Sequence, residues 1–234
     1  MTVHAVELKT LEINDTSVDI RVFAAEGDTL LLGFPCDEGK SVAEERTAQS
    51  LADDGIEVWM PDMLTAYMLP KLRSSLHEIP TDDLAIIIGE AMKTGKDVYL
   101  VASGPDTELI LRGAQQWEAT QNDKLKGAVL LFPRLYGKAP QPGQIPEYVD
   151  VVGKTQLPLL VLEGERTPNR WSVDHLKKAL AQGGSDVVVK VIPAVRGYFF
   201  KRDDANRSEE VVTSQLAGLI KVGLFYLKRE STND

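Results

Sequence analysis

Cysteine is almost absent from this chain, since Cys36 is the only one in 234 residues. A single thiol excludes a disulfide within the chain, and with only three histidines it disfavours a zinc site built from cysteine and histidine. Disulfides are rare in reducing compartments, so the count fits the cytoplasm, where we expect the protein to reside. We expect no metal and no other cofactor, because the spacing of the acidic residues specifies no metal site.

Long apolar runs and long basic runs are also missing. No window reaches the ~20 apolar residues of a membrane-spanning helix, and the N-terminus lacks the apolar core of a secretory signal. The 35 acidic residues outnumber the 26 basic ones, which gives a net charge of −9 and a pI near 5.0. We therefore expect no binding to nucleic acid and none to a membrane.

The chain does contain enough apolar sequence for one large core. Hydrophobic residues make up 43% of it, so we expect 1–234 to form a single domain. Short apolar or alternating runs predict strands at 5–13, 18–25, 28–33, 56–60, 97–102, 126–132, 157–162 and 186–192. Helical spacing predicts helices at 42–52, 80–93, 106–118, 172–181 and 209–226.

Strand and helix alternate from residue 28 onwards. This order predicts an α/β fold, with a mostly parallel twisted sheet and helices on both of its faces. Two segments have no clear period. We expect a short helix and a loop at 63–79 and irregular structure at 133–153.

A sharp turn, Ser103-Gly104-Pro105, joins the predicted strand 97–102 to the predicted helix 106–118. Ser103 precedes Asp106 by three residues, which is the spacing of a helix-capping pair, and Pro105 suits a first helical turn. We therefore interpret Ser103 as a helix cap.

Five landmarks follow one another in an order typical of one large superfamily. They are 30–35 (LLLGFP), 55–62 (GIEVWMPD), 102–106 (ASGPD), 157–165 (LPLLVLEGE) and 191–199 (VIPAVRGYF). Together they make the chain similar to the α/β-hydrolase superfamily. Its size and long last helix most resemble the dienelactone hydrolase-like members. The resemblance implies a three-layer α/β-hydrolase-like fold without a cap domain.

The resemblance also assigns the three positions of a catalytic triad. The nucleophile position falls on Gly104, the acid position on Thr167 and the histidine position on Tyr198. Glycine has no side chain to attack a substrate, and a phenol with a pKa of ~10 is a poor base at neutral pH. The triad is thus expected to be degenerate. Glycine also adopts the strained backbone of such a turn without a steric penalty.

We therefore predict a pseudo-hydrolase that binds a small molecule or a protein partner at a vestigial active site. Ligands of open α/β sheets lie beyond the carboxyl ends of the strands. The residues expected to form the pocket there are Phe34, Cys36, Ser103 and Asp106, next to the three triad positions.

Two alternatives stay open at this point. One is an active hydrolase of an ester, lactone or related carbonyl substrate, with Ser103 or Cys36 as an unconventional nucleophile and a base nearby. The other is a scaffold whose partner binds 63–76 or 133–153, which predicts an exposed apolar patch in those segments.

Overall fold

The centre of the molecule is one eight-stranded sheet with the strand order β1-β2-β4-β3-β5-β6-β7-β8. The computed structural model describes residues 6–35, 42–121, 124–141 and 143–230. The pairs β1–β2 and β2–β4 are antiparallel, and every other pairing is parallel. The strands are β1 (Glu7–Ile13), β2 (Thr16–Phe23), β3 (Thr29–Gly33), β4 (Ile56–Pro61), β5 (Asp97–Ser103), β6 (Gly127–Leu131), β7 (Leu159–Gly164) and β8 (Val187–Ile192). The predicted mostly parallel sheet is confirmed.

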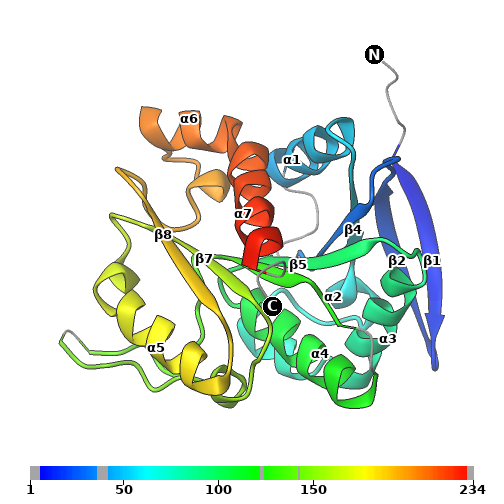
Figure 1. Ribbon diagram of the computed structural model, residues 1–234, viewed down its shortest axis with the longest axis horizontal. Coiled ribbons are helices and arrows are strands. Elements are labelled where there is room, and N and C mark those ends of the chain that lie inside the picture. Colours follow the sequence, from blue (N-terminus) through cyan, green and yellow to red (C-terminus); the bar gives the residue numbers. More distant parts are fainter. Residues whose placement is uncertain (1–5, 36–41, 122–123, 142, 231–234) are drawn as a thin grey trace.

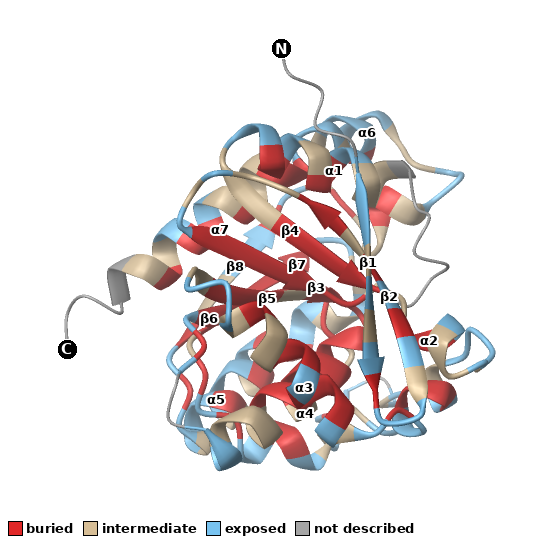
Figure 2. Ribbon diagram, turned by 90° about the vertical axis from the view of Figure 1, so that its right-hand side faces the viewer, coloured by how far each residue is buried: buried red, intermediate tan, exposed pale blue. Residues whose placement is uncertain are grey.

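Helices cover both faces of this sheet (Figures 1 and 2). One face carries α3, α4 and α5, and the other carries α1, α6 and α7 (Figure 2). The helices are α1 (Val42–Asp53), α2 (Met63–Ala66), α3 (Thr81–Met92), α4 (Asp106–Thr120), α5 (Val173–Gly183), α6 (Arg207–Ser214) and α7 (Leu216–Glu230). The short 3₁₀ turns are η1 (Arg73–His77), η2 (Asp150–Gly153), η3 (Pro168–Ser172) and η4 (Phe199–Lys201). The result is three layers.

The central strands are mostly apolar because helices cover both of their faces. Every residue of β3, β6 and β7 is buried. Successive side chains of β3 point to opposite faces, so Leu30 and Leu32 join the core beneath α3 to α5, whereas Leu31 joins the core beneath α1 and α7. A strand buried on both faces appears in the sequence as a continuous apolar run, which is why these strands were predictable.

The predicted helix cap at Ser103 is wrong, although the helix begins at residue 106 as predicted. Ser103 is the last residue of β5, and α4 begins at Asp106 after Pro105. No side-chain hydrogen bond caps α4. Ser103 is therefore a strand residue and not the helix cap that its spacing suggested.

The predicted helix 209–226 is in fact two helices, α6 and α7, which bend by 59° at their junction. Asn206 caps α6, because its side chain accepts a hydrogen bond from the Glu209 backbone N–H. In the described part of the chain no single helix is long and apolar enough to cross a membrane, and only the bent α6–α7 pair, taken together, reaches that length and composition.

The packing of α3 against α4 makes a direct prediction for Gly113. A Cβ atom at Gly113 would lie 2.9 Å from the Leu84 Cβ on α3, whereas a Cβ at Gly218 on α7 would meet no heavy atom within 4 Å. We expect Gly113→Ala to lower the free energy of unfolding by about 1–2 kcal/mol through overpacking. Gly218→Ala should raise it by up to about 1 kcal/mol through helix propensity. Urea unfolding of both variants checks this, and equal effects would contradict the close α3–α4 contact.

Candidate functional site

Gly104 forms the turn between β5 and α4. Its φ is +58°, in the left-handed region that glycine adopts freely. The Gly104 N–H donates to the Leu131 carbonyl oxygen at 2.9 Å, and the Gly104 carbonyl oxygen accepts from the Arg134 N–H at 3.0 Å. The Thr107 hydroxyl also donates to that carbonyl oxygen at 2.5 Å. The turn is therefore bonded both to the end of β6 and to the first turn of α4.

The phenol of Tyr198 lies directly on Gly104. A Cβ atom at position 104 would be 1.2 Å from the Tyr198 Oη atom and 2.2 Å from its Cζ atom. The hydroxyl oxygen is buried, and Tyr198 itself has a left-handed φ of 56°. The tyrosine hydroxyl thus occupies the space into which any side chain at position 104 would extend.

Thr167 lies next to the same loop. Its backbone N–H donates to the Gly164 carbonyl oxygen at 3.1 Å, just beyond the end of β7. A Cβ atom at Gly197 would be 3.4 Å from the Thr167 Cγ2 atom, so Thr167 packs beside the residue that precedes Tyr198. Of the three positions that the resemblance assigns to a triad, the structure thus places Tyr198 on Gly104 and Thr167 beside the residue before Tyr198.

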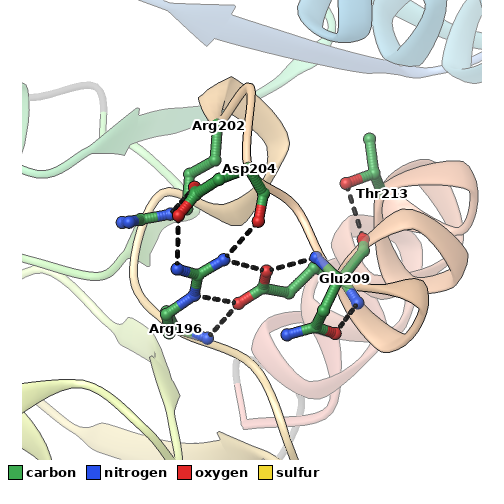
Figure 3. A network of polar contacts seen from close by, with 6 residues as sticks. Arg196, Arg202, Asp204, Glu209 and Thr213 are labelled. Carbon is green, nitrogen blue, oxygen red and sulfur yellow. Dashed lines mark hydrogen bonds and ion pairs between the residues drawn. The ribbon is translucent and has the colours of Figure 1, made fainter.

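A polar network holds the loop that carries Tyr198 (Figure 3). The Arg196 guanidinium donates to both carboxylate oxygens of Glu209, at 2.7 and 2.6 Å, and the Arg196 backbone N–H donates to the same carboxylate at 2.9 Å. Arg196 also donates to Asp204 at 2.9 Å. Glu209 is fully buried, and the hydrogen bonds from Arg196 lower its pKa to about 2. The loop is thereby fixed to the start of α6.

Glu163 is an acidic residue whose burial the sequence did not reveal. It is 1% exposed at the end of β7, and its carboxylate accepts a hydrogen bond from the Gly164 N–H at 2.9 Å. Burial raises the pKa of Glu163 to about 7, although the Gly164 amide, the Thr167 hydroxyl and the charge of Arg170 counteract part of this rise. Its one sequence signal is an acid at the end of an otherwise apolar run. Within the described ranges no three His, Cys, Asp or Glu side chains gather as a metal site would require.

An apolar cavity of about 80 Å³ lies between the sheet and the helices α1 and α7. Phe34 and Ser103 line it, so two of the four residues predicted to form a pocket share one cavity. Asp106 is buried in the first turn of α4 and is not part of the cavity lining. Cys36 lies outside the described residues. None of the three positions that the resemblance assigns to a triad lines the cavity, although Gly104 directly follows the lining residue Ser103.

Ser103 lacks a histidine partner in this cavity. The described residues of the lining include the acid Glu44 and the hydroxyl of Thr47, but no histidine. His77 instead lies 3.6 Å from Glu108, and His175 belongs to α5 on the opposite face of the sheet. The described lining of the cavity therefore offers Ser103 no imidazole base of the kind that an activated serine requires.

Comparisons with known proteins find likeness at the level of structure alone. No protein-family model matches the sequence, and no curated protein sequence matches it. Among solved structures, a fungal esterase from Rhizomucor miehei is 12% identical with a TM-score of 0.68, and the match covers 98% of this chain and 86% of that one. Esterase 2 of Thermogutta terrifontis is 13% identical with a TM-score of 0.62, and the match covers 96% of both chains.

A third similar structure is a predicted CIB-like hydrolase from Thermoplasma acidophilum. It is 12% identical with a TM-score of 0.57, and the match covers 92% of this chain and 99% of that one. At such low identities the likeness shows the fold alone. The chain has the α/β-hydrolase fold, as the order of its landmarks predicted.

The contact between Gly104 and Tyr198 predicts a specific pattern of stabilities. Gly104→Ala should destabilise the fold through both its left-handed φ and its clash with Tyr198. Gly95 also has a left-handed φ of 74° but open space around a Cβ, so Gly95→Ala measures the backbone cost alone, about 1–2 kcal/mol. We expect Gly104→Ala to cost at least 2 kcal/mol more than Gly95→Ala.

The additional loss of stability in Gly104→Ala should vanish when Tyr198 is also replaced by alanine, because the clashing phenol is then gone. Urea unfolding of the wild type, Gly104→Ala, Tyr198→Ala and the double variant forms a double-mutant cycle. A Gly104→Ala cost that does not depend on residue 198 would show that the two residues are not in contact.

Glu163 predicts a pH dependence of stability. Its pKa is raised from 4.5 to about 7 in the folded state, so the unfolded chain loses this proton first as pH rises. Burial of Glu163 should therefore destabilise the fold progressively from pH 4.5 to 7. Relative to the wild type, we expect the free energy of unfolding of Glu163→Gln to rise by roughly 3 kcal/mol as the pH increases from 5 to 8.

Thermal or urea unfolding at several pH values measures this gain. The exposed neighbour Glu165 supplies the control variant Glu165→Gln. Parallel stability curves for Glu163→Gln and the wild type would contradict a buried, proton-binding Glu163.

Proposed function

We propose that this chain is a non-catalytic protein of the α/β-hydrolase fold, similar to dienelactone hydrolases, which binds a small molecule beside a degenerate triad. One observation carries the proposal. The Tyr198 hydroxyl lies 1.2 Å from the place of a Cβ atom at Gly104, so position 104 has neither a nucleophile nor the space for one.

Acyl transfer on this fold requires three side-chain roles. A nucleophile attacks the carbonyl carbon, a base of near-neutral pKa takes its proton, and a carboxylate orients the base. Gly104 cannot attack, a tyrosine phenol has a pKa of ~10, and Thr167 carries a hydroxyl in place of a carboxylate. None of the three roles is supported at these positions, and binding is the function that the remaining cavity at Phe34 and Ser103 favours.

Hydrolysis with Ser103 or Cys36 as the nucleophile is the competing hypothesis. The Ser103 hydroxyl lines a cavity, which favours access of a small substrate. The described residues that line the cavity with Ser103 include a carboxylate, Glu44, but no imidazole, which disfavours this hypothesis.

A protein partner is a second candidate for what the molecule binds. Met68, Leu72 and Ile145 are 92%, 58% and 59% exposed, and they belong to the two irregular segments of the chain. A contiguous patch of such side chains would favour association with another protein. A partner that binds there should lose affinity at least tenfold for Met68→Ser/Leu72→Ser, measured by calorimetry, and unchanged affinity would exclude this surface.

Restoring the triad tests the proposed loss of catalysis. The wild type should hydrolyse p-nitrophenyl acetate no faster than buffer. The triple variant Gly104→Ser/Thr167→Asp/Tyr198→His replaces the phenol with a smaller imidazole and adds the missing nucleophile and acid. We expect it to exceed the buffer rate by on the order of 10²-fold.

The matched control carries alanine in place of serine at position 104 and should be inactive. A folded triple variant without activity would show that these are not the triad positions. Wild-type hydrolysis that disappears in Ser103→Ala or Cys36→Ser would instead establish the competing hydrolase.

A further inference from the structure

The apolar cavity connects two parts of the molecule. Its walls come from the sheet and from the inner faces of α1 and α7, and include Leu31, Met60, Leu51 and Ile220. A larger groove of about 700 Å³ lies next to it, between α1, α6 and η4. Thr47 and Phe200 line both spaces, so the cavity and the groove meet at these two residues. The groove and the cavity are therefore direct neighbours.

An ion pair lies where the two spaces meet. Glu44 lines the cavity, Lys201 lines the groove, and the Lys201 Nζ atom is 3.0 Å from the Glu44 carboxylate. The two side chains are only 16% and 12% exposed. Each charge thus compensates the other.

The walls of the cavity decide the chemistry that fits inside it. Apolar walls cannot solvate a charge, and burial of an unpaired charge is strongly unfavourable. The volume of about 80 Å³ is roughly half that of a ~150 Å³ apolar cavity that binds benzene in another protein. It has room for a chain of a few carbons.

One polar group on the sheet side adds a further constraint. Ser103, at the end of β5, contributes its hydroxyl to the lining, whereas the Thr47 hydroxyl already donates to the Ala43 carbonyl oxygen at 2.7 Å. A ligand with one hydroxyl or carbonyl oxygen can hydrogen-bond Ser103 and place its carbons against the apolar walls.

We propose that this cavity binds the aliphatic end of an uncharged molecule with a hydroxyl or carbonyl group, which enters from the groove between α1 and α6. The assignment rests on the proposed binding function and specifies its ligand class. The site lies between the sheet and the α1–α7 layer, and not at the Gly104–Tyr198 contact.

Titration with 1-hexanol, followed by methyl NMR of the full-length protein, tests this proposal. We expect saturable shifts and intermolecular NOEs to the Ile220 and Leu51 methyl groups. Ala48 lines the cavity on α1, so Ala48→Leu should fill it and weaken binding at least tenfold. The matched control Ala181→Leu changes an exposed residue of α5, on the opposite face of the sheet, and should bind as the wild type does.

Charged homologues test the ligand class. Hexanoate and hexylammonium should bind at least tenfold more weakly than 1-hexanol. Equal binding of either ion, unchanged binding in Ala48→Leu, or the absence of NOEs to Ile220 and Leu51 in the wild type would each overturn the proposal. The NOE measurement needs no variant, so it decides the matter even if Ala48→Leu does not fold. Because alcohols are not hydrolysed, this outcome is independent of the ester assay on the restored triad.

Discussion

The candidate site depends on one contact, in which the phenol of Tyr198 lies against the Cα atom of Gly104. Only glycine permits it, because a Cβ atom would lie 1.2 Å from the tyrosine oxygen. Both residues have a left-handed φ, which glycine adopts freely but which costs other residues about 1–2 kcal/mol. The surrounding structure must therefore stabilise Tyr198 in a conformation that it would not adopt alone.

That stabilisation comes from both sides of Tyr198 in the chain. Two residues before it, Arg196 makes a bidentate ion pair with the buried carboxylate of Glu209. Directly after it, Phe199 packs edge to face on Phe132 with ring centroids 5.4 Å apart. With the loop held on both sides, the tyrosine ring is placed over the turn. The contacts that stabilise this edge of the sheet are therefore the same ones that exclude a nucleophile.

Local pattern predicted the frame of the molecule well and its site less well. Strands such as β3, β6 and β7 were predictable because burial on both faces produces uninterrupted apolar runs. The positions 104, 167 and 198 came from the order of family landmarks and not from any periodicity. Ser103 was misassigned because a capping spacing also occurs by chance at a strand end. The burial of Glu163 and the pairing of Arg196 with Glu209 depend on which elements meet in space, and sequence periodicity does not specify that.

We propose that no side chain at this site acts as a nucleophile, and covalent labelling tests this most directly. Intact-mass spectrometry would follow the wild-type protein after incubation with a fluorophosphonate, next to an active serine esterase as the positive control. We expect the mass of the wild type to stay unchanged while the esterase gains one adduct. A stoichiometric adduct that peptide mapping places on Ser103 would contradict it, because a reactive serine implies an activating base close to the end of β5.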